Sequence, residues 1–211
     1  MAGRDDYGLI RNGALAVKDG RIAWIGAAQE LPGHPAALAA RVEALGGAWV
    51  TPGFIDCHTH LVYAGNRAHE FEMRLKGASY EAIAKAGGGI LSTVQAVRTA
   101  NEDDIHTQSL PRLKALMADG VTTLEIKSGY GLDTPNELKM LNVIRRLAAD
   151  TPLTLVPTFL GAHTVPPEFK GRGDDYVQVV VPDMLPEVAR QGLAHAVDVF
   201  CENIGFYLPQ T

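Results

Sequence analysis

Short apolar runs that alternate with helix-like segments constrain the fold of this chain more than any other feature. The runs are rich in β-branched residues and have the length of buried strands. They lie at Val121 to Ile126, Leu153 to Phe159 and Val197 to Cys201, and an earlier loop at Val50 to Asp56 leads into a further strand. This alternation predicts parallel β/α units and an α/β fold.

The clearest helix is predicted to begin at Thr134. Thr134 can cap the helix, Pro135 suits its first position, and Glu137 completes a capping box. The side chains expected to face the core are Leu138, Leu141 and Ala148.

Two further helical stretches, Tyr80 to Lys85 and Ile90 to Ala100, are separated by Gly87-Gly88-Gly89. Three glycines give the backbone unusual freedom. The segment can therefore be a mobile loop or an ordinary turn between helices, and the sequence does not decide between them.

The first 50 residues have a different pattern. Two apolar runs within residues 13–26 flank Asp19-Gly20, and Asp-Gly between strand-forming runs is typical of a hairpin with a type I′ turn. We expect residues 1–50 to form a separate β element and residues 51–211 to form the β/α part. A complete eight-unit barrel needs about 200 to 250 residues, so four strands in residues 51–211 predict an incomplete, truncated barrel.

Charge and hydropathy exclude two classes of partner. Nineteen basic and 24 acidic residues give a net charge of −5, which disfavours binding along nucleic acid. The apolar runs fall short of the roughly 18 residues that span a bilayer, and the first residues lack a signal peptide's apolar stretch. We expect a cytoplasmic protein in which Cys57 and Cys201 are buried, reduced thiols.

His58 and His60 lie one residue apart at the end of an apolar strand. Side chains alternate along a strand, so both imidazoles share a face with Asp56. Two converging imidazoles form half of a transition-metal site, suited to zinc or iron. The alternative is a pair of surface or hydrogen-bonded histidines.

Several motifs together resemble one known family. Residues 52–60, Pro-Gly-Phe-Ile-Asp-Cys-His-Thr-His, resemble the first-strand signature of the amidohydrolase superfamily. Six further motifs, in order, are similar to those of the imidazolonepropionases. They are Gly65 to Phe71, Ala78 to Tyr80, Gly87 to Ile90, Glu125 to Leu132, Leu160 to His163 and Val197 to Glu202.

This resemblance implies a metal-dependent hydrolase with a (β/α)8 TIM barrel. Residues 51–211 would be its N-terminal half, and residues 1–50 would be part of a small β-sandwich. The implied activity is hydrolysis of 4-imidazolone-5-propanoate to N-formimidoyl-L-glutamate in histidine degradation, with one divalent zinc or iron ion, by a protein that is a homodimer at full length.

The resemblance also assigns site residues. It implies that His58 and His60 are metal ligands and that the substrate is contacted by Arg67, Tyr80, Tyr130 and His163. His163 is expected to hydrogen-bond or polarise the ring carbonyl. The family's acid–base residues and remaining metal ligands would lie beyond Thr211, so we expect this chain alone to be inactive.

Purely structural roles are also open for several of these residues. Arg67 can instead pair with Glu70 or Glu72, Tyr130 can pack in its loop, and His163 can be structural. We expect a structural or electrostatic role for Lys127, which ends a strand.

Two other functions are also open for the chain as a whole. It can belong to a related cyclic amidohydrolase or deaminase, or it can be a non-catalytic fragment that binds a metal or a partner.

Overall fold

The computed structural model describes residues 8–79, 82–83, 87–202 and 204–211. Most of the helix predicted from Tyr80 to Lys85 lies outside these residues. The chain divides into two compact units, Met1–Pro52 and Gly53–Thr211. No helix within the described residues has both the length and the apolar character needed to cross a membrane.

The first unit contains the predicted hairpin. Strand β1 (Gly13–Lys18) pairs antiparallel with β2 (Arg21–Ala27), and Lys18 lies opposite Arg21. The two turn residues, Asp19 and Gly20, have φ angles of 51° and 73°, as a type I′ turn requires. A 3-10 turn, η1 (Ala28–Glu30), and a short helix, α1 (Pro35–Leu38), follow.

The second unit is built on a parallel sheet, which confirms the predicted α/β class. Its strands, in the order β3-β4-β5-β6, are β3 (Phe54–Asp56), β4 (Val121–Lys127), β5 (Thr154–Ala162) and β6 (Ala196–Val199). All three neighbouring pairs are parallel, a pattern compatible with part of a TIM barrel. Within the described residues β3 and β6 are the edge strands. Because the strands are parallel, all their carboxyl ends lie along the same side of the sheet.

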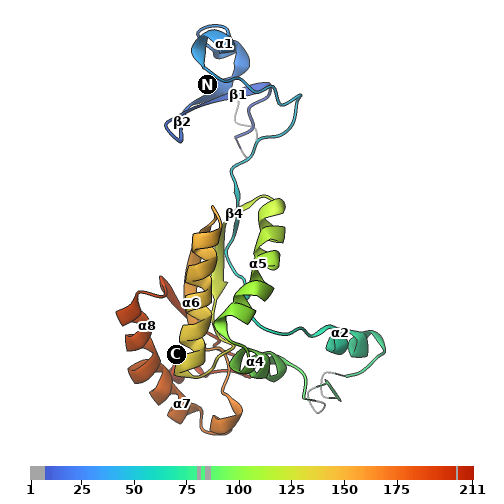
Figure 1. The fold of residues 1–211 in the computed structure, drawn as a ribbon, viewed down its shortest axis with the longest axis vertical. Helices are drawn as coiled ribbons and strands as arrows, with labels where there is room; N and C mark the ends of the chain where they lie inside the picture. The colour runs from blue at the N-terminus through green and yellow to red at the C-terminus, as the bar shows by residue number, and fades with distance from the viewer. Residues whose placement is uncertain (1–7, 80–81, 84–86, 203) are drawn as a thin grey trace. The chain divides into compact units, whose positions relative to one another are not determined.

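Helices connect the strands in sequence (Figure 1). Those between β3 and β4 are α2 (Ala68–Leu75), α4 (Ile90–Thr99) and α5 (Glu102–Ala118). Between β4 and β5 lies α6 (Thr134–Asp150), and between β5 and β6 lie η2 (Pro167–Phe169), α7 (Gly173–Val179), the π-helical turn η3 (Val180–Met184) and α8 (Leu185–Gln191). A last 3-10 turn, η4 (Leu208–Gln210), follows β6. Helices α5 and α6 pack on each other, and α6 packs on β5.

The N-cap of helix α6 lies one residue earlier than predicted. The cap is Asp133, whose carboxylate accepts a hydrogen bond from the Asn136 N–H, so the prediction of Thr134 as cap was wrong. The helix buries Met140, Leu141, Val143, Ile144 and Leu147, but Ala148 is exposed. Larger side chains at positions 140, 144 and 147 set the buried face, because burying them removes more apolar area from water than burying alanine.

The two cysteines are unpaired, as predicted, but both are exposed. Cys57 directly follows β3, and Cys201 lies two residues beyond the end of β6. Each therefore adjoins an edge strand, where no neighbouring strand covers it in the described structure. The prediction of buried thiols was wrong.

Candidate functional site

Four predicted site residues meet at the carboxyl ends of the strands. His58 and His60 follow β3, Tyr130 follows β4, and His163 follows β5. The His60 ring lies 5.6 Å from the His58 ring, 4.9 Å from the His163 ring and 5.5 Å from the Tyr130 ring, measured between centroids. Three separate segments of sequence therefore contribute to one cluster of nitrogen and oxygen donors.

His60 is the centre of this cluster. Its Nδ1 atom is buried and has no hydrogen-bond partner among the described residues. Burial, followed by the proximity of His163, His58 and Lys127, lowers the pKa of His60 to about 4. The imidazole is therefore neutral at pH 7, the form in which histidine ligates metals.

These properties fit a metal ligand but do not complete a metal site. A neutral imidazole with a buried, unpartnered nitrogen suits zinc or ferrous iron, and His58 is a second imidazole beside it. The described residues contain no group of three or more His, Cys, Asp or Glu side chains able to hold a metal ion. The chain thus brings two candidate ligands together.

Lys127 lies between two carboxylates. Its Nζ is 2.8 Å from Glu125 Oε1 and 2.9 Å from Asp198 Oδ2 on β6, and its side chain is 8% exposed. Burial opposes the charged ammonium, but the two carboxylates outweigh it and raise the pKa of Lys127. Glu125 also accepts a hydrogen bond from the Thr59 N–H, so this charged group contacts the segment between the two histidines.

His163 is held through its ring by the loop after β4. Its Nδ1 lies 2.8 Å from the Gly129 carbonyl oxygen. A carbonyl oxygen only accepts, so Nδ1 carries a proton and donates it. Burial is the main cause of the lowered pKa of His163. The neutral ring then has a bare Nε2, which can accept a hydrogen bond but cannot donate one to a carbonyl.

Tyr130 is the neighbouring donor. Burial raises the pKa of its hydroxyl, so the phenol stays protonated at neutral pH and can donate. Its ring lies 5.4 Å from the His163 ring and 6.5 Å from the Tyr63 ring. Tyr80 lies outside the described residues, and its predicted role stays a prediction.

Arg67 makes one of the ion pairs that the sequence left open. Its Nε donates to Glu70 Oε2 at 2.9 Å, and the Arg67 side chain is 45% exposed. Glu70 also accepts from the Gly89 N–H and the Ser92 hydroxyl at the start of α4. Gly89 is the cap of α4. The N–H of Gly88 donates to the Ile83 carbonyl oxygen, so two of the three glycines are held by hydrogen bonds.

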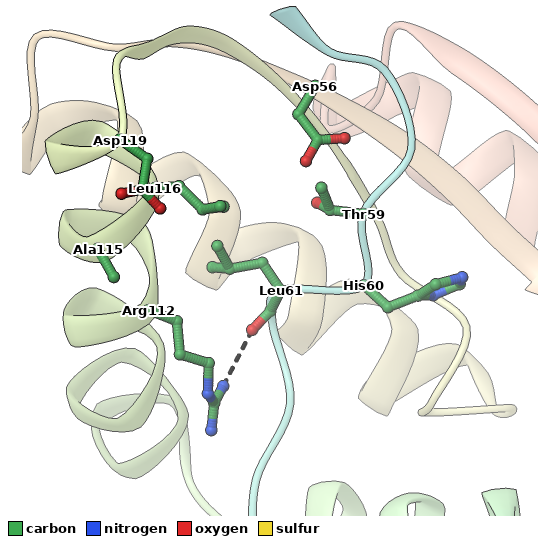
Figure 2. Close-up of a pocket in the computed structure, with 8 residues that line it drawn as sticks. All are labelled: Asp56, Thr59, His60, Leu61, Arg112, Ala115, Leu116 and Asp119. Atoms are coloured by element: carbon green, nitrogen blue, oxygen red, sulfur yellow. Dashed lines mark hydrogen bonds between the residues drawn. The ribbon is translucent and has the colours of Figure 1, made fainter.

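A separate pocket lies between residues 56–61 and α5, with a volume of about 450 Å³. Figure 2 shows Leu61, Leu116 and Arg112 around it, with the His60 ring directed away from Leu116 and Arg112. The Arg112 guanidinium donates to the Leu61 carbonyl at 2.9 Å. His60 also lines this pocket, but its ring points toward the other histidines and Tyr130, so we place the candidate site at the cluster.

The chain is closely similar to several proteins named imidazolonepropionase. It is 60% identical over 210 residues to one from Ralstonia nicotianae, and these residues are 100% of the chain and 51% of the relative. It is 56% identical over 211 residues to one from Colwellia psychrerythraea and 58% identical over 207 residues to one from Paraburkholderia phymatum, covering 99% and 98% of the chain and 50% of each relative. Over its whole length the chain is therefore similar to the imidazolonepropionases. It spans about half the length of the curated relatives it matches. No protein-family model matches it.

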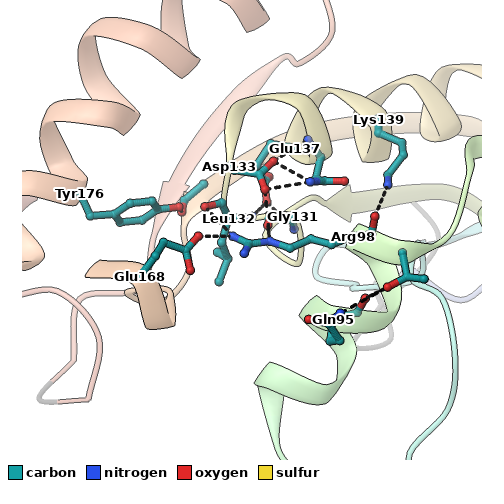
Figure 3. Close-up of polar contacts among 12 residues, drawn as sticks. Gln95, Arg98, Gly131, Leu132, Asp133, Glu137, Lys139, Glu168 and Tyr176 are labelled. Atoms are coloured by element: carbon teal, nitrogen blue, oxygen red, sulfur yellow. Dashed lines mark hydrogen bonds and ion pairs between the residues drawn. The ribbon is translucent and has the colours of Figure 1, made fainter. Parts of the chain in front are cut away.

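Imidazolonepropionase motifs did not point to two residues that shape the site of this chain. Glu137 and Arg98 contact the loop that carries Tyr130 (Figure 3). The capping-box pattern predicts only a helix-capping role for Glu137, and Arg98 lies within a predicted helix. Both bind backbone groups of residues 129–132, which leave no signal in the side-chain pattern.

Proposed function

We propose that the protein containing this chain hydrolyses 4-imidazolone-5-propanoate to N-formimidoyl-L-glutamate. The observation that carries the proposal is the convergence of His58, His60, Tyr130 and His163 at one sheet edge. The chain that makes this cluster is 56% to 60% identical to proteins named for that activity.

The proposal includes the finer architecture expected from the sequence. Residues 51–211 form the N-terminal part of an amidohydrolase (β/α)8 barrel, and residues 1–50 form part of a β-sandwich. The four-stranded parallel sheet and the separate hairpin support this assignment. The homodimer and the cytoplasmic location are part of the same proposal.

His58 and His60 would hold one divalent ion, zinc or iron. When bound, such an ion supplies Lewis acidity and lowers the pKa of a water molecule. The neutral state of His60 supports this role, since no proton has to leave the ring before it binds a cation near pH 7.

The other side chains would bind and orient the substrate. Hydrolysis adds water across the ring amide, so that a hydroxyl group joins the carbonyl carbon and a proton joins the departing ring nitrogen. The Tyr130 hydroxyl is a donor suited to the ring carbonyl. With Nδ1 already donating to Gly129, His163 is suited to accept a ring N–H through Nε2.

Arg67 would bind the propanoate group. Glu70 contacts Nε, and neither Nη nitrogen of Arg67 has a hydrogen bond to another described residue. Two terminal nitrogens on one planar group match the geometry of a carboxylate. Tyr80 would be a further substrate contact.

Metal binding by residues 1–211 tests the ligand assignment. We expect weak, chelator-reversible binding of Zn²⁺ by calorimetry, lost when His58→Ala and His60→Ala are combined. His195→Ala is the matched control, because His195 lies outside the cluster, and it should leave binding unchanged. Binding that survives the double substitution would mean that the site lies elsewhere.

A chimera tests the activity. Residues 1–211 are joined to the remaining half of the Ralstonia nicotianae protein, and loss of imidazolone absorbance is followed with and without a chelator. We expect chelator-sensitive turnover by the chimera and none by residues 1–211 alone, since the described residues bring together only two candidate ligands. An inactive but folded, metal-loaded chimera would contradict the proposed function.

A further inference from the structure

Glu137 is a fully buried carboxylate in the first turn of α6, directed at the loop after β4. Its Oε1 accepts from the N–H groups of Gly131 and Leu132 at 2.8 Å and 2.9 Å, and Oε2 accepts from the Gly129 N–H at 3.0 Å. Burial raises the pKa of this carboxyl, and the N–H donors together with Ser128 oppose that shift. A buried carboxylate persists only where donors replace its water, and here a single loop provides them.

Arg98 binds the carbonyl groups of the same loop. Its Nε donates to the Gly131 oxygen at 2.7 Å and its Nη2 to the Leu132 oxygen at 3.2 Å. Figure 3 shows the guanidinium beside Glu168 and Asp133, which lie 2.7 Å and 3.2 Å from its nitrogens. The loop is therefore held by an anion at its N–H groups and by a cation at its carbonyls.

The loop has little room to adopt another conformation. A Cβ atom added at Gly131 would lie 2.4 Å from the Glu137 nitrogen. One added at Gly129, where φ is +106°, would lie 2.8 Å from the Leu160 oxygen and 2.9 Å from His163 Nδ1. Backbone packs on backbone at both positions, so the contacts of Glu137 fix the course of residues 129–132.

We propose that Glu137 is a positioning residue that sets both Tyr130 and His163. It acts on Tyr130 because it binds the residues on either side, and on His163 because the Gly129 carbonyl receives the Nδ1 proton. One buried carboxylate on α6 thereby fixes the tautomer of a histidine that follows β5. The effect of this positioning on substrate binding rests on the proposed function, but the positioning of Tyr130 and His163 does not.

The tautomer of His163 tests the inference without substrate or metal. In residues 1–211 labelled with ¹⁵N and held at about pH 8, above the ordinary imidazole pKa, we expect His163 to show a protonated Nδ1 and a bare Nε2. Glu137→Gln places an amide NH2 among N–H donors, so we expect the Nδ1–H signature to be lost. An Nε2–H tautomer in the unsubstituted chain would overturn the proposal whatever the variants do.

Two further variants separate positioning from general stability. Glu137→Asp keeps the charge but shortens the reach; it should weaken the Nδ1–H signature, and it serves if Glu137→Gln does not fold. Val143→Ala removes buried volume from the same helix, six residues beyond Glu137, and it should leave the His163 tautomer unchanged. A wild-type His163 signature in folded Glu137→Gln would show that Glu137 only stabilises the helix.

The chimera then links positioning to the reaction. Glu137→Asp should lower kcat at least 10-fold with a smaller change in KM, whereas Val143→Ala should change each less than 2-fold. Equal losses in both variants would contradict the role of Glu137. If the unsubstituted chimera is inactive, the proposed function fails, and the tautomer experiment still decides the positioning.

Discussion

Two segments that follow the carboxyl ends of neighbouring strands are held in very different ways. The loop of residues 128–133, after β4, is fixed by a buried carboxylate and a largely buried guanidinium. Helix α2, which follows Arg67 after β3, contains no buried residue, and its Phe71 and Leu75 are 62% and 74% exposed. Its described link to the rest of the unit runs through Glu70 to the start of α4.

This difference divides the candidate site into a preorganised part and a loosely supported part. Tyr130 and His163 are positioned by the core, so substitutions around them should change stability and geometry together. Arg67 depends on exposed contacts, which contribute little to folding. Substitution there should change binding with little cost to the fold.

The largest expected effect is on substrate binding at Arg67. In the chimera, Arg67→Ala should raise KM with little change in kcat. The increase corresponds to roughly 2 to 5 kcal/mol of lost binding free energy, if the carboxylate pair is desolvated. The unfolding free energy of residues 1–211 should change by less than about 0.5 kcal/mol, because the side chain is exposed. Steady-state kinetics and urea unfolding measure the two quantities.

Two results would break this part of the comparison. One is a lower turnover rate with unchanged KM in Arg67→Ala. The other is equal hydrolysis, by the unsubstituted chimera, of an analogue that lacks the carboxylate.

The next effect concerns stability at two glycines. Gly131→Ala should destabilise residues 1–211 by roughly 1 to 3 kcal/mol, because the new methyl group meets the α6 backbone, which cannot move aside. Gly77→Ala, just after α2, meets no atom within 4 Å and should cost about 1 kcal/mol for its left-handed φ of +89°.

Urea unfolding of both glycine variants compares the two segments directly. Gly131→Ala should also disturb the His163 tautomer, and Gly77→Ala should not. A larger loss for Gly77→Ala would reverse the assignment of rigid and loose regions.

A further effect is the pH dependence of stability that His60 causes. In the unfolded chain this imidazole takes up a proton near pH 6.5, but in the folded chain it does so only near pH 4. Between these values the unfolded state binds more protons, so stability should fall as the pH is lowered from 6.5 to 4. The ring ¹³C shift of His60 should titrate near 4, and His60→Asn should flatten the stability profile. A midpoint near 6.5 would show that the cluster is solvated.

The sequence predicted those parts of the fold that depend on local patterns. The hairpin followed from Asp19-Gly20, because a type I′ turn needs two residues with positive φ. The parallel strands followed from apolar, β-branched runs separated by helices. Because the carboxyl ends of these strands lie side by side, they bring together His58, His60, Tyr130 and His163, which come from distant segments of the sequence.

Other features depended on packing that a local pattern does not encode. Thr134 and Asp133 are both good caps, and the structure uses Asp133, whose carboxylate accepts from the Asn136 N–H. Glu137 looked like a capping-box residue, yet its carboxylate binds N–H groups five to eight residues earlier. The exposure of Cys57 and Cys201 depended on which strands are edges, which the order of the sheet decides.

Those two exposed thiols give the chain its own chemical reporters. Each stands beside a different edge strand, Cys57 after β3 and Cys201 after β6. The rate of alkylation at each sulfur therefore measures how far its edge is open to solvent. Slower labelling of both thiols in the chimera than in residues 1–211 would mean that added strands cover both edges, and slowing at one alone would mean that a single edge is covered.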